Sequence, residues 1–337
     1  MRPAILAENE LAFDIHPDDT EDFRAGVEFH EMPVRQILNR CSNPLLPFRW
    51  TINPYRGCEF GCVYCYARYT HEFLEMRDPM DFERRIFVKR MAAQVLARTL
   101  SRTPIGTDAI ALGTATDPYQ PAERRFGLTR SMLEVFAKLS GLNLSITTKS
   151  ALVTRDLDAL VEINRRSNLS VNFSCITLNR RLQRILEPRA PRPELRMRAL
   201  AELSRAGIRC SVFLMPVIPG LTDDARTIES VVRTARYSGA RSVGWRTLFL
   251  KPAAARRFIP FVKERLPEIA PRIEAMYSGA VYAPRTYDEK LGALFDHLRT
   301  KYGFPPREDR RCGSAAPAAI KGSEQLSLGV TAHSATA

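Results

Sequence analysis

Strand-like and helix-like runs alternate along the middle of the chain. Leu142 to Thr148 alternates apolar and polar positions with the two-residue period of a strand, whereas Asp156 to Arg166 has the spacing of a helix. The strand-like runs cover residues 48–53, 108–113, 142–148, 169–178, 208–215 and 241–250. Because each is followed by helical sequence, the pattern predicts an α/β fold with a parallel sheet, either open or curled into a barrel. Such folds keep their chemistry at the carboxyl ends of the strands.

The predicted helices carry boundary signals of their own. Asp156 fits an N-cap, and Pro193 and Gly207 fit the start and the stop of one helix. The predicted helices cover residues 82–100, 128–139, 156–166, 179–186, 193–206 and 222–238, and three more close the fold over 252–306.

The ends of the chain differ from the middle. Residues 1–31 carry nine acids and two bases and lack a clear period, so we expect an acidic arm that extends to residue 44. The last residues are rich in Ala, Ser, Thr and Gly, which is typical of a disordered tail. The sequence therefore predicts an arm, a core, a C-terminal helical segment and a tail, over 1–44, 45–251, 252–306 and 307–337.

Composition narrows the class of protein. The 337 residues are 45% hydrophobic, as in globular proteins, and contain no apolar run of about 18 residues that could cross a membrane. The N-terminus lacks the basic and apolar regions of a signal peptide. Seven cysteines, an odd number, favour a reducing compartment in which thiols act as ligands or pack in the core. We expect a cytoplasmic protein without a membrane partner.

The net charge of +13 divides into about −7 on residues 1–31 and +20 on the remainder. A basic body suits a polyanionic partner such as a nucleic acid. The excess of Arg over Lys, 42 to 8, has an equally simple explanation in codon bias. Basic clusters occur at Arg84, Arg85, Lys89 and Arg90, at Arg124 and Arg125, at Arg180, Arg181 and Arg184, and at Arg256 and Arg257.

The strongest chemical signal is a group of three cysteines just past the first strand. Cys58, Cys62 and Cys65 have the spacing C-x3-C-x2-C. Three thiolates so close together can each bind one iron of a cubic cluster and leave the fourth iron open, and an open metal position is typical of catalysis. Gly57 and Gly61 allow the backbone to approach such a cluster.

A zinc site is the alternative. The same cysteines with His71 would make four ligands, as in a non-catalytic, metal-stabilised module that binds nucleic acid. Zinc loops favour paired C-x2-C motifs, which this sequence lacks.

The cysteine spacing, with the aromatic Tyr64 before the third cysteine, resembles the radical SAM superfamily. The fuller string NPYRGC…CVYCYAR resembles the spore photoproduct lyase-like branch, and the resemblance covers about residues 45–250. It implies a partial (β/α)6 TIM-type barrel and a [4Fe–4S] cluster on Cys58, Cys62 and Cys65. It also implies that S-adenosylmethionine (SAM) binds the open iron, and that a flavodoxin- or ferredoxin-type donor reduces the cluster. Reductive cleavage of SAM then gives a 5′-deoxyadenosyl radical, which acts on an unassigned substrate with a nucleic acid as one candidate.

The resemblance also implies which residues hold SAM. Tyr64 would stack on the ligand, and the end of the second strand would contact the methionyl amino group. Lys149, at the end of the third strand, would pair with the methionyl carboxylate. The residues expected at the second strand end are Gly113, Thr114, Thr116 and Asp117. A plain Asp-Pro turn explains that segment equally well, and a strand-end lysine is often only solvated.

The fourth and fifth strands supply further candidates. Asn172 and Ser174 share one face of a strand and suit a ribose or methionyl group, whereas Cys175 on the other face suits packing against helices. Arg189, after this strand, could bind a carboxylate or lie on the surface. The Pro-Gly turn in 215–223 could approach an adenine edge through backbone groups.

One departure from the branch concerns the hydrogen donor. In spore photoproduct lyases a cysteine at the second strand end returns a hydrogen atom to the product radical, and Thr114 occupies the matching position. An O–H group donates hydrogen atoms much less readily than a thiol. That reaction would therefore require a thiol from Cys41, Cys210 or Cys312.

Overall fold

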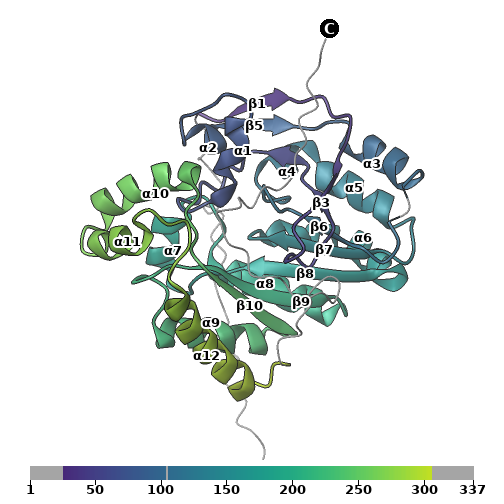
Figure 1. The fold of residues 1–337 in the computed structure, drawn as a ribbon. Coiled ribbons are helices and arrows are strands. Elements are labelled where there is room, and N and C mark those ends of the chain that lie inside the picture. The colour runs from purple at the N-terminus through teal and green to yellow at the C-terminus, as the bar shows by residue number, and fades with distance from the viewer. Residues whose placement is uncertain (1–25, 104, 306–337) are drawn as a thin grey trace, which may run out of the picture.

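The computed structural model describes residues 26–103 and 105–305, and a seven-stranded sheet forms the centre of this part of the chain (Figure 1). Its strand order is β10-β9-β8-β7-β6-β3-β2. Neighbouring strands from β3 to β10 are parallel, and β2 (Leu38–Arg40) pairs antiparallel with β3. The parallel strands are β3 (Trp50–Ile52), β6 (Ala109–Leu112), β7 (Asn143–Thr148), β8 (Asn168–Ser174), β9 (Arg209–Val217) and β10 (Ser242–Thr247).

These strands confirm the six predicted ones, with shifted ends. The largest shift is at β8, which ends at Ser174 rather than at residue 178. Strands β10 and β2 are the edges of the sheet, so the sheet in the described residues is open and does not close into a barrel. The predicted α/β class with a parallel sheet is confirmed.

Helices follow the parallel strands in the predicted order. The helix α8 begins at Pro193, and Gly207 follows it with a φ of +82°. The longer helices between strands are α3 (Ala92–Leu100), α5 (Leu128–Phe136), α6 (Leu157–Arg166), α7 (Arg180–Leu186), α8 (Pro193–Arg205) and α9 (Ala225–Tyr237). The closing segment contains α10 (Pro252–Arg265), α11 (Ala270–Tyr277) and α12 (Arg285–Lys301). Short helices are α1 (Tyr69–Glu72), α2 (Asp81–Arg84) and α4 (Ala122–Phe126), with 3₁₀ turns at Tyr66–Arg68 and Ala151–Asp156.

The prediction of one helix over 82–100 is wrong, because strand β5 (Arg85–Val88) separates α2 from α3. Strand β5 pairs in parallel with β1 (Glu28–Glu31) and antiparallel with β4 (Tyr55–Arg56), and the three form a small second sheet (Figure 1). Ile86 and Val88 are buried and alternate with half-buried neighbours. The partners of β5 are distant in sequence, so local spacing alone could not show this strand.

The starts of two helices also differ from the predictions. Asp156 occupies the N-cap position of α6, but its carboxylate accepts hydrogen bonds from Arg155 and caps no backbone N–H of that helix. Helix α9 begins at Ala225 rather than at Thr222, and Asp224 caps it by accepting a hydrogen bond from the Thr227 backbone. Asp156 and Asp224 each accept hydrogen bonds from the donors that the fold places beside them. Sequence position alone does not show which donors these are.

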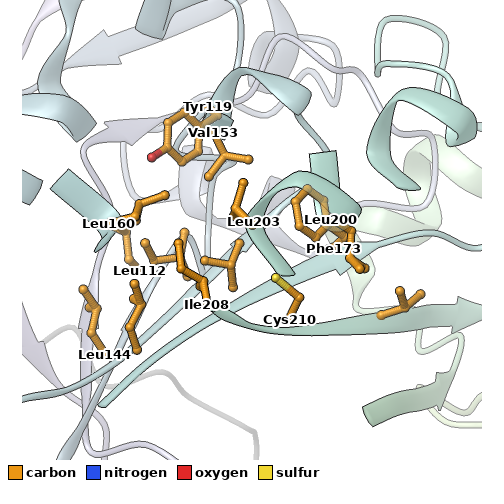
Figure 2. Packing of buried hydrophobic residues seen from close by; sticks show 14 of the residues in the cluster. Leu112, Tyr119, Leu144, Val153, Leu160, Phe173, Leu200, Leu203, Ile208 and Cys210 are labelled. Carbon is orange, nitrogen blue, oxygen red and sulfur yellow. The ribbon is translucent and has the colours of Figure 1, made fainter. Parts of the chain in front are cut away.

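The main core lies between the sheet and its helices (Figure 2). In this cluster Leu144, Phe173 and Cys210 from the strands pack with Leu160 of α6 and Leu200 of α8. Cys175 is fully buried in the same cluster, in agreement with its predicted packing role. A second cluster joins the 58–67 segment to α10 and α11, so the closing helices support the loop that carries the three cysteines. The tail predicted from residue 307 lies outside the described residues.

Candidate active site

The cysteine loop begins at Gly57, directly after β4. Gly57 has a φ of +89°, and a Cβ atom there would lie 2.8 Å from the Arg85 carbonyl oxygen and 2.9 Å from that of Phe82. The Cys58 backbone N–H donates to the same Phe82 oxygen at 2.9 Å. Gly61, with a φ of +63°, makes a second turn. Only glycine fits the first turn without strain. The carbonyl groups of Phe82 and Arg85 therefore determine how the cysteine loop begins.

The three cysteines of the loop form no disulfide. Cys58 and Cys62 are 8% and 7% exposed, and Cys65 is partly buried. Burial raises the pKa of each thiol above its usual value, and that of Cys62 to about 12. Metals bind the thiolate form, so a cationic centre is needed to keep all three deprotonated here. Sulfur donors at this spacing fit an iron–sulfur cluster.

His71, the fourth ligand of the zinc alternative, lies in a different environment. Its Nε2 atom is hydrogen-bonded to the Arg85 carbonyl oxygen at 2.9 Å, and its ring packs edge-on against Phe82 and Phe87. Within residues 26–103 and 105–305, no three His, Cys, Asp or Glu side chains form a group that could hold a metal ion. This applies to the three cysteine side chains as well as to the set with His71, so the side-chain positions do not distinguish zinc from an iron–sulfur cluster.

Tyr64 connects the loop to a buried ion pair. Its hydroxyl donates to Glu187 Oε1, and Glu187 Oε2 pairs with Arg196 Nη2 of α8 at 2.5 Å. Both charged side chains of the pair are fully buried. Arg196 also donates to the Ser174 carbonyl oxygen at the end of β8. Burial alone would raise the pKa of Glu187, but Arg196 and Lys149 lower it overall, so this residue remains a carboxylate.

Lys149 lies beside this network. Its Nζ atom is 5.9 Å from the centre of the Tyr64 ring, and its backbone N–H donates to Asp117 at 2.7 Å. Burial lowers the pKa of the Lys149 ammonium, but Cys62, Glu187 and Asp117 outweigh burial and raise it overall. A fixed positive charge thus stands next to the cysteine loop.

The end of β6 holds the loop in place. Thr116 Oγ1 donates to the Gly57 carbonyl oxygen at 2.6 Å, and Thr114 accepts hydrogen bonds from Asn53 Nδ2 and, at its carbonyl oxygen, from Tyr66. A Cβ atom on Gly113, whose φ is +89°, would lie 2.7 Å from the Thr147 carbonyl oxygen. The backbone therefore passes very close to the neighbouring strand here.

The Asp117 carboxylate completes this turn. It accepts hydrogen bonds from Thr148 Oγ1 at 2.6 Å and from the backbone N–H groups of Lys149 and Tyr119. Burial raises the pKa of Asp117, while these hydrogen bonds act in the opposite direction. Its oxygens therefore link the ends of β6 and β7.

The candidates on β8 and after it occupy different environments. Asn172 Nδ2 donates to Ser145 Oγ at 2.9 Å and to the Ile146 carbonyl oxygen, and the buried Ser174 hydroxyl lies 3.5 Å from the Met215 carbonyl oxygen. The backbone N–H of Arg189 donates to the Phe60 carbonyl oxygen, which places Arg189 against the cysteine loop. Its buried Nη1 atom has no hydrogen-bond partner among the described residues. An unpaired buried donor is costly unless a ligand completes it.

Of the three cysteines considered as hydrogen donors, the structure describes Cys41 and Cys210. Cys41 is 2% exposed and lines a cavity of which Thr114 is also a wall residue. Cys210 is fully buried in the main core. Cys312 lies outside the described residues.

Sequence reasoning missed the partners that hold these residues. Arg196, Glu83 and Arg68 are all buried, and Arg68 pairs with Glu83 and donates to the Cys62 carbonyl oxygen at 2.9 Å. Acids and arginines that are nearly fully buried occur almost only when paired, but the sequence spacing of such pairs has no fixed pattern. Among the described residues, ion pairs partly neutralise three of the four predicted basic clusters. They join Arg90 to Glu31, Arg180 to Glu194 and Arg256 to Glu72.

The described helices include none that is both long and apolar enough to cross a membrane.

Among family models, the one described as the radical SAM superfamily matches residues 52–231. An uncharacterized protein of Mycobacterium tuberculosis is 35% identical over 278 residues, which is 82% of each chain. An uncharacterized protein of Methanocaldococcus jannaschii is 28% identical over 243 residues, which is 72% of this chain and 85% of the relative.

Solved structures of spore photoproduct lyase share the fold. One point mutant has a TM-score of 0.62 at 15% identity, and a double mutant with bound AdoMet and dinucleoside spore photoproduct has a TM-score of 0.59 at 16% identity. Each comparison covers 90% of this chain and 85% of the solved chain. At this identity the likeness concerns the fold, and it extends beyond the residues of the family match.

Proposed function

Because the chain belongs to the radical SAM superfamily, we propose that Cys58, Cys62 and Cys65 hold a [4Fe–4S] cluster whose fourth iron binds S-adenosylmethionine. The observation that carries the proposal is the loop of three free thiols fixed by Gly57 and supported by buried charges. When bound and reduced, the cluster supplies the electron that cleaves SAM to methionine and a 5′-deoxyadenosyl radical. The protein is an enzyme of this chemistry rather than the zinc module.

The chain's own residues would orient SAM. The Lys149 ammonium and the unpaired Nη1 atom of Arg189 supply positive charge and a donor suited to the methionyl carboxylate. The Gly113–Thr114 backbone, held by Thr116 and Asp117, suits the methionyl amino group. Asn172 and Ser174 are assigned to the ribose or methionyl portion, and Tyr64 holds the loop and borders the ligand.

The partners follow from this chemistry. The cluster requires an external electron donor of the flavodoxin or ferredoxin type. The substrate is proposed to be a nucleic acid, which agrees with the basic body of the chain. A solved structure that shares the fold, the spore photoproduct lyase double mutant, contains a bound dinucleoside spore photoproduct. If the reaction requires a thiol hydrogen donor, Cys41 is a candidate for it, since it lines the same cavity as Thr114.

Anaerobic reconstitution tests the proposal. Protein loaded with iron and sulfide, reduced and given SAM should release 5′-deoxyadenosine, and its EPR spectrum should change on addition of SAM. Alanine in place of Cys58, Cys62 or Cys65 should lower the iron content and abolish 5′-deoxyadenosine formation. Cys210→Ala, which removes a core thiol, serves as the matched control and should retain both.

Metal analysis distinguishes the zinc alternative. Protein purified without oxygen should contain iron and acid-labile sulfide. Tight stoichiometric zinc, or a reconstituted cluster that neither responds to SAM nor yields 5′-deoxyadenosine, would contradict the proposed function.

A further inference from the structure

A cavity of about 240 Å³ lies beside the strand ends that carry the candidate site. Its wall includes Asn53 directly after β3 and Thr114 two residues after β6. Cys41 also lines it but follows the antiparallel β2, so it lies toward the opposite edge of the sheet. Asn53 Nδ2 donates to Thr114 Oγ1 at 3.2 Å, so these two wall residues form one polar surface. The cavity therefore adjoins the part of the sheet where SAM is proposed to bind.

The charge of the wall has one sign. Arg35, Arg40, Arg56 and Lys89 line the cavity, and no Asp or Glu is among its lining residues in the described part of the chain. Arg35 and Arg40 are exposed, whereas Arg56 and Lys89 are half-buried. Arg180 of α7 and Arg256 of α10 form ion pairs with carboxylates. The four cations of the cavity have no carboxylate beside them in its wall. An anion in the cavity would supply the missing negative charge.

The surroundings of Lys89, a half-buried cation of the wall, disfavour its charged form. Lys89 Nζ donates to the Asn53 carbonyl oxygen at 2.8 Å and so points along the wall. Burial, and then the nearby Arg56 guanidinium, lower the pKa of Lys89 to about 8. A bound phosphate would relieve both effects, because it adds an opposite charge where two cations repel each other.

Aromatic rings border the same cavity. Tyr69 and Phe73 of the α1 region are lining residues, and Phe73 is 58% exposed. The two rings meet edge to face, with centroids 5.8 Å apart. Exposed aromatic faces next to a cationic groove are the combination that binds single-stranded nucleic acid, in which bases stack and phosphates pair with cations.

We propose that this cavity binds one nucleotide unit of a single-stranded nucleic acid, with its phosphodiester at Arg56 and Lys89 and a neighbouring base against Phe73. Arg35 and Arg40 at the exposed edge contact the adjoining phosphates. The rest of the strand is proposed to lie on the surface beside the cavity. Treating this strand as the substrate rests on the proposed function, whereas its binding does not.

Fluorescence anisotropy measures the binding directly. A short fluorescein-labelled single-stranded DNA is titrated with the cluster-loaded protein under anaerobic conditions, at several salt concentrations. The test variant is Arg35→Gln combined with Arg40→Gln, because both side chains are exposed. We expect the affinity for DNA to fall about ten-fold. The slope of log Kd against log salt should decrease by the amount that corresponds to about one to two lost phosphate contacts.

A matched control removes the same charge elsewhere. Arg98 of α3 and Arg205 of α8 are exposed and lie outside the cavity. Arg98→Gln combined with Arg205→Gln should leave affinity and salt slope within about two-fold of wild type. Phe73→Ala should weaken binding at least about five-fold with an unchanged salt slope, because a stacked base contributes about 1–3 kcal/mol.

Three outcomes would overturn the proposal. These are equal losses in the test and control pairs, no effect of Phe73→Ala, and equally tight, Arg35- and Arg40-dependent binding of polyglutamate. The proposed function fails separately. If the loaded protein binds DNA as expected but yields no 5′-deoxyadenosine from SAM, the cavity assignment stands and the radical SAM assignment falls.

Discussion

Tyr64, in the middle of the cysteine loop, donates its hydroxyl hydrogen to Glu187, which lies 123 residues further along the chain. Glu187 is in turn paired with Arg196, and both side chains are fully buried. The loop is thereby attached to the helices that follow β8. The position of the three thiols depends on a charged pair that touches none of them directly.

The first prediction concerns this pair. Glu187→Gln leaves the Arg196 guanidinium buried without a counter-ion, and breaking a buried pair in this way costs about 3–5 kcal/mol. Urea unfolding followed by circular dichroism should show a loss of this order in the free energy of unfolding. Glu289→Gln removes an exposed carboxylate from a pair with Arg285 on α12 and should cause no measurable change. Equal stability of the two variants would refute the structural role of Glu187.

The second prediction concerns Gly57. An alanine Cβ would approach the Arg85 and Phe82 carbonyl oxygens within 3 Å, at a φ that side chains rarely adopt. Gly57→Ala should therefore lower the iron bound after reconstitution several-fold, as measured by iron analysis and cluster absorbance. In the control Gly292→Ala, the new methyl would lie 3.6 Å from Trp245 in ordinary contact. If both variants bind iron like wild type, the turn at Gly57 does not determine the site.

The third prediction separates SAM binding from cluster binding. Lys149→Gln removes the buried cation beside Tyr64 without removing a thiol, so iron content should be retained. The affinity for SAM, measured by the EPR change of the reduced cluster, should fall about ten- to a hundred-fold, as expected for one lost hydrogen bond to a charged group. Lys138→Gln, at an exposed lysine, is the control. An unchanged SAM titration would remove Lys149 from the binding site.

The fourth prediction concerns pH. The pKa of Lys89 is lowered from 10.5 to about 8, first by burial and then by Arg56. Between these values the unfolded chain binds more protons than the folded chain, so the contribution of Lys89 makes stability rise with pH. The rise is at most about 3 kcal/mol, since one pKa unit corresponds to about 1.4 kcal/mol. Urea midpoints measured from pH 7.5 to pH 10 (about the range of this shift) should rise less steeply in Lys89→Met than in wild type or Lys138→Met.

The parallel strands were predictable because their signal is local. The alternation in Leu142–Thr148 reports directly which side chains are buried in β7. Strand β5 was hidden because its four residues gain their burial from β1 and β4, which are distant in the sequence. Its neighbours in α2 and α3 are helical, and a short strand between two helices has too few residues to reveal its own period.

Candidate site residues could be chosen from the sequence where residue spacing carries chemistry. Cys58, Cys62 and Cys65 were chosen by their spacing and Lys149 by its place at a strand end, and their roles stay predictions. Arg196 could not be found in this way, because its role comes from a neighbour across the fold and arginine is abundant in this chain. The one-sign cavity was equally hidden, since its four cations come from separate segments and only folding brings them to one wall.

The contact between residues 82–88 and the turn at Gly57 also bears on the order in which the site can form during synthesis. The ribosome releases the three cysteines before residues 82–88, yet the Phe82 and Arg85 carbonyl groups fix the start of the cysteine loop. A nascent chain that ends shortly after Cys65 therefore holds the thiols without the backbone that arranges them. If the three cysteines hold a cluster as proposed, stable binding of that cluster is expected only after β5 has been synthesised.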